Sequence, residues 1–306
     1  MRFTYQRRGF GFVACFTIVT AIASGACLSV THAGIVTSGL TLHLDASAGV
    51  TTDGSGHVSD WADQTALGHN ASAGDGFRPL LVDNLLNGHA VVRFDGASNR
   101  MDIAGSLLNS QQYTIVAVVN DTRADDSYRE VISNWTGSNS ITSVFLGTIN
   151  TTPTSVRFTD DFGGNAPGGG GNGVGSLTNP QSHFILSAVS AADASVYQNH
   201  DPLASLGHAI LPRDLSTPWS LGSQGQNSFE FWQGDMAEVL VYDRELNSTE
   251  LQQTWDALDQ KYGFNSPAAV PEPTAIAIWG GIGIAGLFTA RRCKRVQASN
   301  PRTFTM

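Results

Sequence analysis

Apolar residues recur in short alternating runs from position 39 to position 242, and clusters of Gly, Asn, Asp and Ser separate the runs. Alternation with a period of two is typical of β-strands, and such polar clusters are typical of turns. We predict strands at 40–44, 91–94, 113–119, 131–135, 143–146, 155–158, 184–189, 194–197, 219–222 and 236–242. About a dozen short strands with no helical period among them predict an all-β fold of two packed antiparallel sheets.

One amphipathic helix is predicted after the last of these strands. Asn247 precedes Glu250 by three residues, which is the spacing of a capping box. One apolar stripe follows at helical spacing and contains Leu251, Trp255, Leu258 and Tyr262. Gly263 stands where a left-handed glycine ends a helix.

The strand at 236–242 is apolar on both faces, which is typical of a strand covered on both sides. We expect one face to carry Ala237, Val239 and Val241, and the other Met236, Glu238, Leu240 and Tyr242. A half-buried Glu238 needs a charged partner, and Arg93 on another predicted strand is the candidate.

The N-terminus has the pattern of a secretory signal peptide. Arg2, Arg7 and Arg8 precede an apolar run from 10 to 26, and small residues end at Ala33 before Gly34. We therefore predict a signal peptide at 1–33 that is cleaved between Ala33 and Gly34. A retained membrane anchor and twin-arginine export through Arg7 and Arg8 remain alternatives.

The C-terminus carries a second apolar run. Residues 274–290 are long enough to cross a hydrocarbon core, and the basic residues of 291–306 should remain cytoplasmic. The sequence therefore predicts a domain at 34–265, a linker at 266–273, a membrane helix at 274–290 and a basic tail at 291–306.

Several short motifs resemble a known fold family. They are Leu42-His43-Leu44-Asp45-Ala46, Trp61-Ala62-Asp63-Gln64, Val92-Arg93-Phe94-Asp95-Gly96, Gly234-Asp235-Met236-Ala237-Glu238-Val239 and Lys261-Tyr262-Gly263. Together they resemble the laminin G-like branch of the concanavalin A-like lectins and glucanases. The resemblance implies a two-sheet antiparallel jelly-roll sandwich over about 39–263, and it leaves the ligand open because one fold hosts many functions.

The C-terminal segment has a resemblance of its own. Pro271, Glu272 and Pro273, followed by the apolar run and the basic tail, resemble the PEP-CTERM sorting signal of exported bacterial proteins. The resemblance implies a membrane-embedded exosortase as partner, transient anchoring through 274–290, and release or transfer of the domain at the cell surface. An ordinary C-terminal anchor is the alternative.

The cysteine residues and the charged residues are distributed according to the same predicted segment boundaries. Cys15, Cys27 and Cys293 all lie outside 34–270, so the exported domain depends on its core rather than on disulfides. That segment holds nine of the 17 basic and 25 of the 26 acidic residues, a net charge of −16. Such an acidic domain lacks the basic footprint of a nucleic-acid-binding protein.

No catalytic pattern is visible in the sequence. Glucanases of this fold place carboxylates two residues apart on one strand, and no such spacing occurs around Glu238. Motifs for a serine nucleophile or a zinc protease are absent, and the seven histidines of 34–270 stand singly. The glycine-rich segment 163–175 is not followed by the Lys and helix of a phosphate-binding loop. We therefore predict that the chain is not an enzyme.

Two sets of residues are candidate ligand sites. Asp53, Asp60 and Asp63 offer hard oxygen ligands to Ca²⁺, although turn and capping carboxylates are the ordinary alternative. Trp61, Trp135, Trp219 and Trp232 offer flat faces to sugar rings, although tryptophan in a sandwich is more often a core residue.

These observations predict an exported, surface-sorted, non-catalytic binding module whose partner is a glycan or an extracellular matrix polymer. A purely structural matrix or adhesion protein is the alternative, and a glycoside hydrolase or lyase is a further one.

Overall fold

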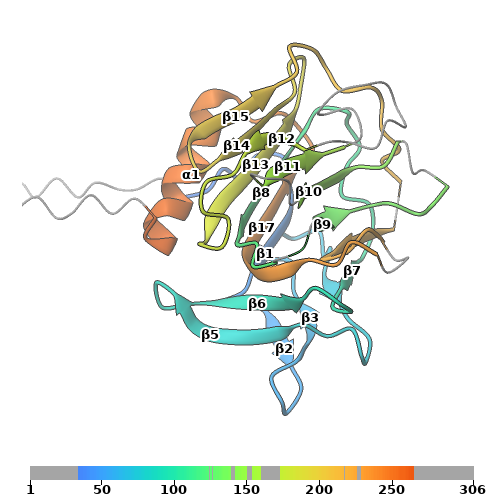
Figure 1. The fold of residues 1–306 in the computed structure, drawn as a ribbon, viewed down its shortest axis with the longest axis vertical. Helices are drawn as coiled ribbons and strands as arrows, with labels where there is room; N and C mark the ends of the chain where they lie inside the picture. The colour runs from blue at the N-terminus through green and yellow to red at the C-terminus, as the bar shows by residue number, and fades with distance from the viewer. Residues whose placement is uncertain are drawn as a thin grey trace, which may run out of the picture. The chain divides into compact units, whose positions relative to one another are not determined.

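The structure is a computed structural model that describes residues 34–264 except 124, 126, 139–141, 150–153, 160–172, 217 and 226–228. The described residues all belong to one compact unit, Ala33–Met306, and the other unit, Met1–His32, lies outside them. They form two β-sheets and one helix (Figure 1).

Sheet A contains eight strands. In chain order they are β1 (Leu40–Asp45), β5 (Leu80–Leu86), β6 (His89–Asp95), β8 (Tyr113–Val119), β13 (Phe184–Ser190), β14 (Ser195–Gln198), β15 (Asp201–Ser205) and β17 (Gln233–Tyr242). Seven of them follow the spatial order β15, β14, β13, β8, β17, β6, β5, and β1 lies off this path. The N-terminal part of β17 pairs with β6 and its C-terminal part pairs with β1, both antiparallel.

Sheet B contains nine strands. In chain order they are β2 (Val50–Thr52), β3 (Val58–Trp61), β4 (Ala71–Ser72), β7 (Met101–Ile103), β9 (Tyr128–Ser133), β10 (Phe145–Ile149), β11 (Ser155–Phe158), β12 (Val174–Ser176) and β16 (Trp219–Leu221). Their spatial order is β12, β11, β10, β9, β16, β7, β4, β3, β2. The predicted two-sheet antiparallel sandwich is confirmed, and the predicted pairing of 131–135 with 143–146 corresponds to β9 and β10.

Two apolar layers hold the elements together. One lies between the sheets and includes Leu42 and Leu44 of β1, Val119 of β8 and Leu146 of β10. The other lies between sheet A and helix α1 (Ser248–Tyr262), and Leu251 is among its helix residues. Strands β8 and β13 are buried along their whole length because both faces of sheet A are covered.

Helix α1 begins and ends as its sequence predicts. The Asn247 side chain accepts hydrogen bonds from the N–H groups of Thr249 and Glu250, and Glu250 Oε2 accepts one from the Asn247 N–H at 3.0 Å. Gly263 adopts a left-handed conformation with φ 75°, and its N–H bonds the Asp259 carbonyl. The whole predicted stripe, including Trp255 and Tyr262, is buried.

The predicted faces of β17 are wrong at its start. The pairing register shifts between Met236 and Glu238, which marks a β-bulge. Met236 consequently points between the sheets with Val239 and Val241, whereas Ala237 joins Leu240 and Tyr242 beneath α1. A period of two cannot reveal a bulge, because both residues are apolar.

No helix in the described part of the chain is long and apolar enough to cross a membrane. The predicted membrane helix at 274–290 and the signal peptide at 1–33 lie outside the described residues.

Candidate functional site

The three aspartates proposed as calcium ligands occupy separate places around β3. Asp53 lies in the turn before β3, Asp60 lies on β3 and is exposed, and Asp63 follows β3 and is nearly buried. Among described residues, the one group of three potential ligating side chains within 4.8 Å of one another is His43, Asp45 and Glu238. The structure therefore does not gather the three aspartates into one ligand set.

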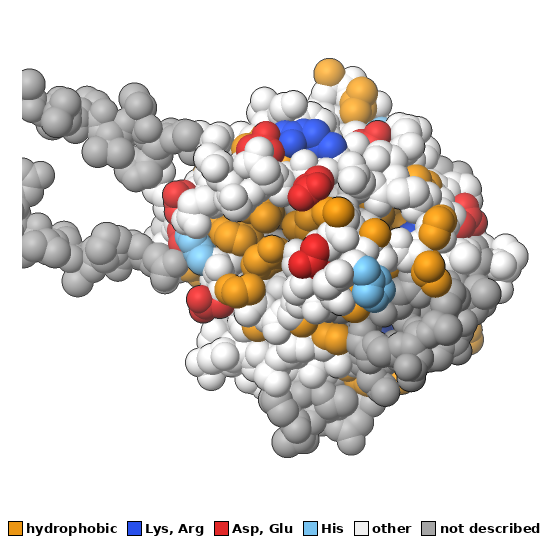
Figure 2. All heavy atoms as spheres, turned by 90° about the horizontal axis from the view of Figure 1, so that it is seen from above, with side chains coloured by type: hydrophobic (Ala, Val, Ile, Leu, Met, Phe, Trp, Pro, Cys, Tyr) orange, Lys and Arg blue, Asp and Glu red, His pale blue; other side chains and the backbone are white. Residues whose placement is uncertain are grey.

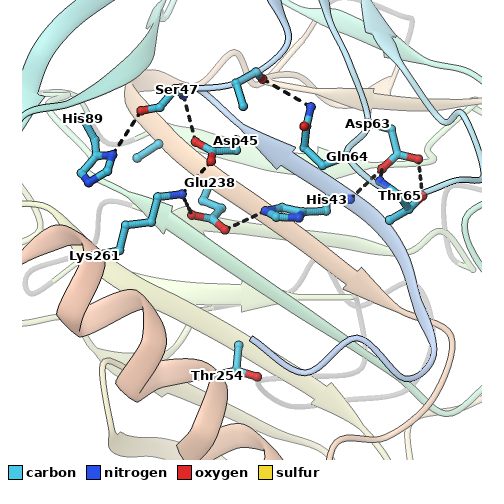
Figure 3. A network of polar contacts seen from close by, with 12 residues as sticks. His43, Asp45, Ser47, Asp63, Gln64, Thr65, His89, Glu238, Thr254 and Lys261 are labelled. Carbon is cyan, nitrogen blue, oxygen red and sulfur yellow. Dashed lines mark hydrogen bonds and ion pairs between the residues drawn. The ribbon is translucent and has the colours of Figure 1, made fainter. Parts of the chain in front are cut away.

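Asp63 accepts hydrogen bonds from its own loop and from β1 (Figure 3). Its Oδ1 accepts hydrogen bonds from the N–H groups of His43 and Thr65 at 3.0 Å each, and Oδ2 accepts one from the His69 N–H at 3.0 Å. Burial acts to raise the pKa of Asp63, but hydrogen bonds led by that from Thr65 outweigh it and lower the pKa. This carboxylate ties β1 to the loop after β3, which is the ordinary alternative considered for it.

The tryptophans divide into core and surface. Trp61, Trp219 and Trp232 are fully buried, so their rings are not available to a sugar. Trp135, after β9, is half-buried and is the one of the four that is not fully buried.

Glu238 and Lys261 form the centre of a buried polar network (Figure 3). Lys261 Nζ lies 2.6 Å from Glu238 Oε2 and 2.8 Å from Asp45 Oδ2. The Tyr262 hydroxyl donates to Glu238 Oε2 at 2.7 Å, and His43 Nε2 lies 2.8 Å from Oε1. We call these five residues the clamp. It joins the end of α1 to β17 and β1.

The clamp corrects one predicted pair and explains several motif residues. Glu238 has a charged partner as expected, but it is fully buried rather than half-buried, and the partner is Lys261. Arg93 instead bonds Asp235 through both carboxylate oxygens at 2.7 and 3.0 Å. Burial acts to raise the pKa of Glu238, but hydrogen bonds from His43 and the Lys261 charge lower it. Since the Lys261 ammonium already occupies the space between both carboxylates, the clamp does not fit a calcium ion, which requires six to eight oxygen ligands.

A second buried glutamate lies in β9 of sheet B. Glu130 is fully buried, and its Oε1 lies 3.6 Å from Arg157 Nη1, which is 2.7 Å from Glu230 Oε2. The Arg157 guanidinium also lies over the rings of Tyr128 and Phe145, at 4.2 and 4.6 Å. Burial, and then the negative charge of Glu230, raises the pKa of the Glu130 carboxyl well above its usual range. Sequence spacing missed this carboxyl pair because its members are far apart in the chain.

Two adjoining polar pockets share His57, Arg78 and Asn99, and we call this pair of pockets the cleft. The larger pocket has a volume of about 450 Å³ and is also lined by Leu80, Arg93, Phe94, Asp95, Thr122, Gln233 and Gly234. The smaller pocket has a volume of about 410 Å³ and is also lined by Asp53, Asp75 and Gly76.

Two carboxylate-centred turns shape the walls of the cleft. Asp53 Oδ1 accepts from the N–H groups of Ser55 and His57 at 2.8 and 3.0 Å. Asp95 Oδ1 accepts from three successive N–H groups, of residues 97–99, at 2.9 Å each. Asp and Asn favour such turns because their short side chains bond the backbone two residues ahead. The turns hold the polar side chains of the cleft in place before any ligand binds.

Arg78 lies at the centre of the cleft. Its Nη2 is 2.7 Å from Asp75, its Nη1 is 3.7 Å from Asp53, and its Nε donates to the Ala73 carbonyl at 3.3 Å. The Asn99 amide donates to the Arg78 carbonyl at 3.0 Å. Guanidinium, amide and imidazole groups therefore lie close to carboxylates in the lining of the cleft.

At the floor of the cleft, β17 closely approaches the chain after β8. Gly234 has φ 148°, and a Cβ there would lie 2.1 Å from the Asn120 carbonyl oxygen, so only glycine fits. The next residue, Asp235, receives Arg93 and also lies 3.2 Å from His183 Nε2. Burial acts to raise the pKa of Asp235, but hydrogen bonds from His183 and Arg93 lower it.

Two carboxylates of the cleft, Asp53 and Asp95, have lowered pKa values. Backbone hydrogen bonds from Ser55 and His57 lower the pKa of Asp53. Burial acts to raise the pKa of Asp95, but hydrogen bonds from Ser98 and Asn99 lower it. A general acid of a glycosidase needs a raised pKa. Both carboxylates are therefore suited to accept hydrogen bonds and not to donate a proton.

The surface also agrees with the acidic composition. The face in Figure 2 shows hydrophobic and acidic side chains interspersed, with basic side chains visible in few places. The described residues on this face form no basic stripe of the kind that a polyanion would require.

Comparison with known families identifies the fold. The model of the concanavalin A-like lectin/glucanases superfamily, in its laminin G form, matches residues 95–252, just over half of the chain. The chain belongs to this superfamily. A search of curated proteins found no match to it.

Solved structures similar to this concanavalin A-like chain have low sequence identity to it. One is the Trypanosoma rangeli sialidase in complex with the inhibitor DANA, with 16% identity and a TM-score of 0.52, covering 74% of this chain and 34% of the sialidase. Another is the binding domain of Paraclostridial Mosquitocidal Protein 1, with 14% identity and a TM-score of 0.51, covering 71% of this chain and 52% of that one. This concanavalin A-like chain thus spans about a third and about half of these proteins, and the likeness concerns the fold.

Most of the residues predicted for signal cleavage and sorting lie outside the described part of the chain. Pro271, Glu272, Pro273 and Ala33 fall outside the described residues. Gly34 is described and exposed, and its carbonyl accepts a hydrogen bond from Gln253 at 2.8 Å.

The cleft itself was not predicted as a site, apart from Asp53. The available signal was the turn chemistry of 53–57 and 95–99 on either side of Arg78.

Proposed function

We propose that this chain is a non-catalytic glycan-binding module and that the cleft is where the glycan binds. The observation that carries the proposal is the arrangement of Arg78, Asn99 and His57 between the ionised carboxylates of Asp53 and Asp95. Sugar hydroxyls both donate and accept hydrogen bonds, so a polyol is recognised by donors and acceptors that alternate within a fixed site. Membership of a superfamily named for lectins and glucanases supports the same class of ligand.

The charge of the cleft favours a neutral glycan over an acidic one. Arg78 is already paired with Asp75 and lies near Asp53, and Arg93 is paired with Asp235. Since the carboxylates of the cleft are at least as numerous as its cations, an added carboxylate or sulfate group would meet repulsion.

The proposal includes export and sorting. The mature domain begins at Gly34 after signal cleavage, and a Pro271-Glu272-Pro273 motif directs an exosortase-type enzyme to the C-terminus. The protein is transiently anchored through 274–290 with the domain outside, and it then resides at the cell surface or beyond it. The supporting observations are the two apolar terminal runs, the basic flank of each, and the absence of cysteine between 34 and 270.

A glycan array probed with the purified domain tests the binding proposal. We expect saturable binding to neutral glycans that falls at least about tenfold in Arg78→Ala, since hydrogen bonds to charged groups contribute about 1.5–3 kcal/mol. Arg244→Ala is a matched control, because Arg244 has similar exposure (30% against 27%) and also pairs with a carboxylate, Glu250. Silence across the array would contradict the proposal and favour a purely structural role, and release of reducing sugar would favour an enzyme.

Calcium should not change the binding of glycans on the array. Among the described residues, the one close group of three ligating His, Asp or Glu side chains is His43, Asp45 and Glu238, and Lys261 already occupies it, so added chelator is expected to leave binding unaltered. Loss of binding with chelator would contradict this expectation.

Mass spectrometry of the protein from its native envelope tests export and sorting. We expect an N-terminus at Gly34 and a C-terminus near Pro271–Pro273. An intact C-terminal segment on a membrane-bound protein would indicate an ordinary anchor instead.

A further inference from the structure

A third pocket lies near the cleft, at the same end of sheet A. It has a volume of about 320 Å³ and is lined by Thr178, Asn179, Ser182, His183, Phe184, Gln198, Asn199, Asp201 and Leu203. We call it the side pocket. Like the cleft, it presents amide, imidazole, hydroxyl and carboxylate groups, which makes it another site suited to a polyol.

Topology places the side pocket and the cleft along one rim. Strands β13, β8, β17 and β6 are consecutive in sheet A and each is antiparallel to the next. The start of β13, the end of β8, the start of β17 and the end of β6 therefore lie at the same end of the sheet. His183 of the side pocket precedes β13, while Gln233 and Arg93 of the cleft lie on β17 and β6.

Hydrogen bonds connect the two sites through the rim. The buried Asp235 carboxylate receives Arg93 from the cleft at 2.7 Å and His183 from the side pocket at 3.2 Å. The loop between the sites is also fixed, because the Asp121 N–H donates to the Pro180 carbonyl at 2.7 Å and the Thr122 N–H to the Gln233 carbonyl at 2.9 Å.

We propose that the cleft and the side pocket are subsites of one extended site, and that its ligand is a linear oligosaccharide lying along this rim. The inference rests on the proposed glycan-binding function and specifies its ligand further. From β6 to β13 there are three strand intervals, or about 14 Å at the usual spacing of neighbouring strands. A monosaccharide is too short to reach both sites, so affinity rises with the length of the chain until both are occupied.

Asn179 and Asp201 allow the side pocket to be altered without disturbing the Asp235 contacts. Asn179 has a positive φ of 48°, so Asn179→Gly removes the amide while the backbone conformation remains accessible. Asp201 is an exposed carboxylate on β15. The double variant Asn179→Gly/Asp201→Ala therefore removes two polar groups of the side pocket only.

A matched control comes from β5. Asn84 also has a positive φ, 55°, and Asp83 is an exposed neighbour, and neither residue lines the cleft or the side pocket. The control variant is Asp83→Ala/Asn84→Gly.

The test measures, by calorimetry, the affinity of the domain for cello-, xylo-, manno- and arabino-oligosaccharides from monosaccharide to hexasaccharide. For the series that binds, we expect the hexasaccharide to bind at least about tenfold more tightly than the disaccharide. The side-pocket variant should lose that gain and keep the disaccharide affinity, and the β5 control should behave as wild type.

Equal affinity at all lengths, or a length gain that survives in the side-pocket variant, would overturn the extended site and leave the glycan-binding proposal intact. Absence of binding by every series would overturn both.

Discussion

The clamp and the cleft are both built from charged side chains of the same domain, yet they use charge in opposite ways. In the clamp, Lys261 lies between Asp45 and Glu238 at 2.8 and 2.6 Å, and Glu238 is 2% exposed. In the cleft, Arg93 is 47% exposed although its carboxylate partner Asp235 is buried. The charged groups of the clamp pair with one another and join α1 to sheet A, whereas charged groups of the cleft remain accessible to a ligand.

The two regions also differ in which parts of the chain build them. Residues of the motifs that resemble the laminin G family occur in both regions: His43, Glu238 and Lys261 meet in the clamp. Asp95 and Gly234 line the cleft. The cleft instead depends on turns, with Asp53 and Asp95 each bonding their own loop. Loops on a fixed scaffold are where binding residues concentrate, so a family match identifies the scaffold and leaves the ligand to the loops.

The largest expected effect is on the clamp. Lys261→Met removes the cation and leaves Glu238 buried with an uncompensated charge. We expect the free energy of unfolding to fall by about 3 kcal/mol, the lower end of the range for breaking a buried pair, since Lys261 is partly exposed. Urea denaturation measures it. The folded variant should keep the glycan affinity of wild type, and a loss of affinity without a loss of stability would contradict the division between clamp and cleft.

The two buried glutamates should show opposite pH dependence. The pKa of Glu238 is lowered, so its stabilising effect is present above the ordinary pKa of 4.5 and is lost as the pH falls through the folded-state pKa. The pKa of Glu130 is raised, so stability is lost as the pH rises from 4.5 through the folded-state pKa. Glu238→Gln should therefore destabilise the domain most at neutral pH, whereas Glu130→Gln should stabilise it there.

Thermal unfolding of both glutamine variants across pH provides the measurement. At low pH, where wild-type glutamates become protonated, each variant should approach wild type. A destabilised Glu130→Gln at neutral pH would show that its negative charge is required by Arg157.

An intermediate effect is expected from the cleft wall. Asn99→Ala removes the amide that donates to the Arg78 carbonyl and the oxygen that accepts from the Asp95 N–H, both at 3.0 Å. Each such bond contributes about 1 kcal/mol, so stability should fall modestly while glycan affinity falls about tenfold. Calorimetric titration measures the glycan affinity, and urea denaturation measures the stability. An unchanged affinity would exclude Asn99 from ligand binding.

The sequence predicts a region of the structure well when the interactions that form the region are local in the chain. The helix was predictable because Asn247, Glu250 and Gly263 act within α1, and central strands were predictable from unbroken apolar runs. Strands of two or three residues, such as β4 and β7, are too short to show a period, and Asn84 at positive φ interrupts the alternation in β5.

The residues of the sites come together through contacts between distant parts of the chain, and spacing in the sequence does not reveal such contacts. The clamp joins β1 to residues at the end of α1, more than 200 positions away in the case of Asp45 and Lys261. The prediction that a tryptophan binds sugar assumes that its side chain is exposed. Exposure depends on how the sheets pack, and Trp61 and Trp219 belong to the layer between the sheets.

The smallest expected effect concerns Asp75, which is 89% exposed and lies 2.7 Å from Arg78. An exposed ion pair contributes about 0–1 kcal/mol, so Asp75→Asn should leave the free energy of unfolding within about 0.5 kcal/mol of wild type. Asp75→Asn breaks one exposed ion pair, whereas Lys261→Met breaks the two ion pairs of the clamp, so the two variants contrast the cleft with the clamp. The substitution leaves Arg78 less neutralised, so binding of glycans that carry a carboxylate should increase relative to neutral ones on the same array. A loss of stability comparable to that of Lys261→Met would mean that the cleft, like the clamp, uses its charges to hold the fold together.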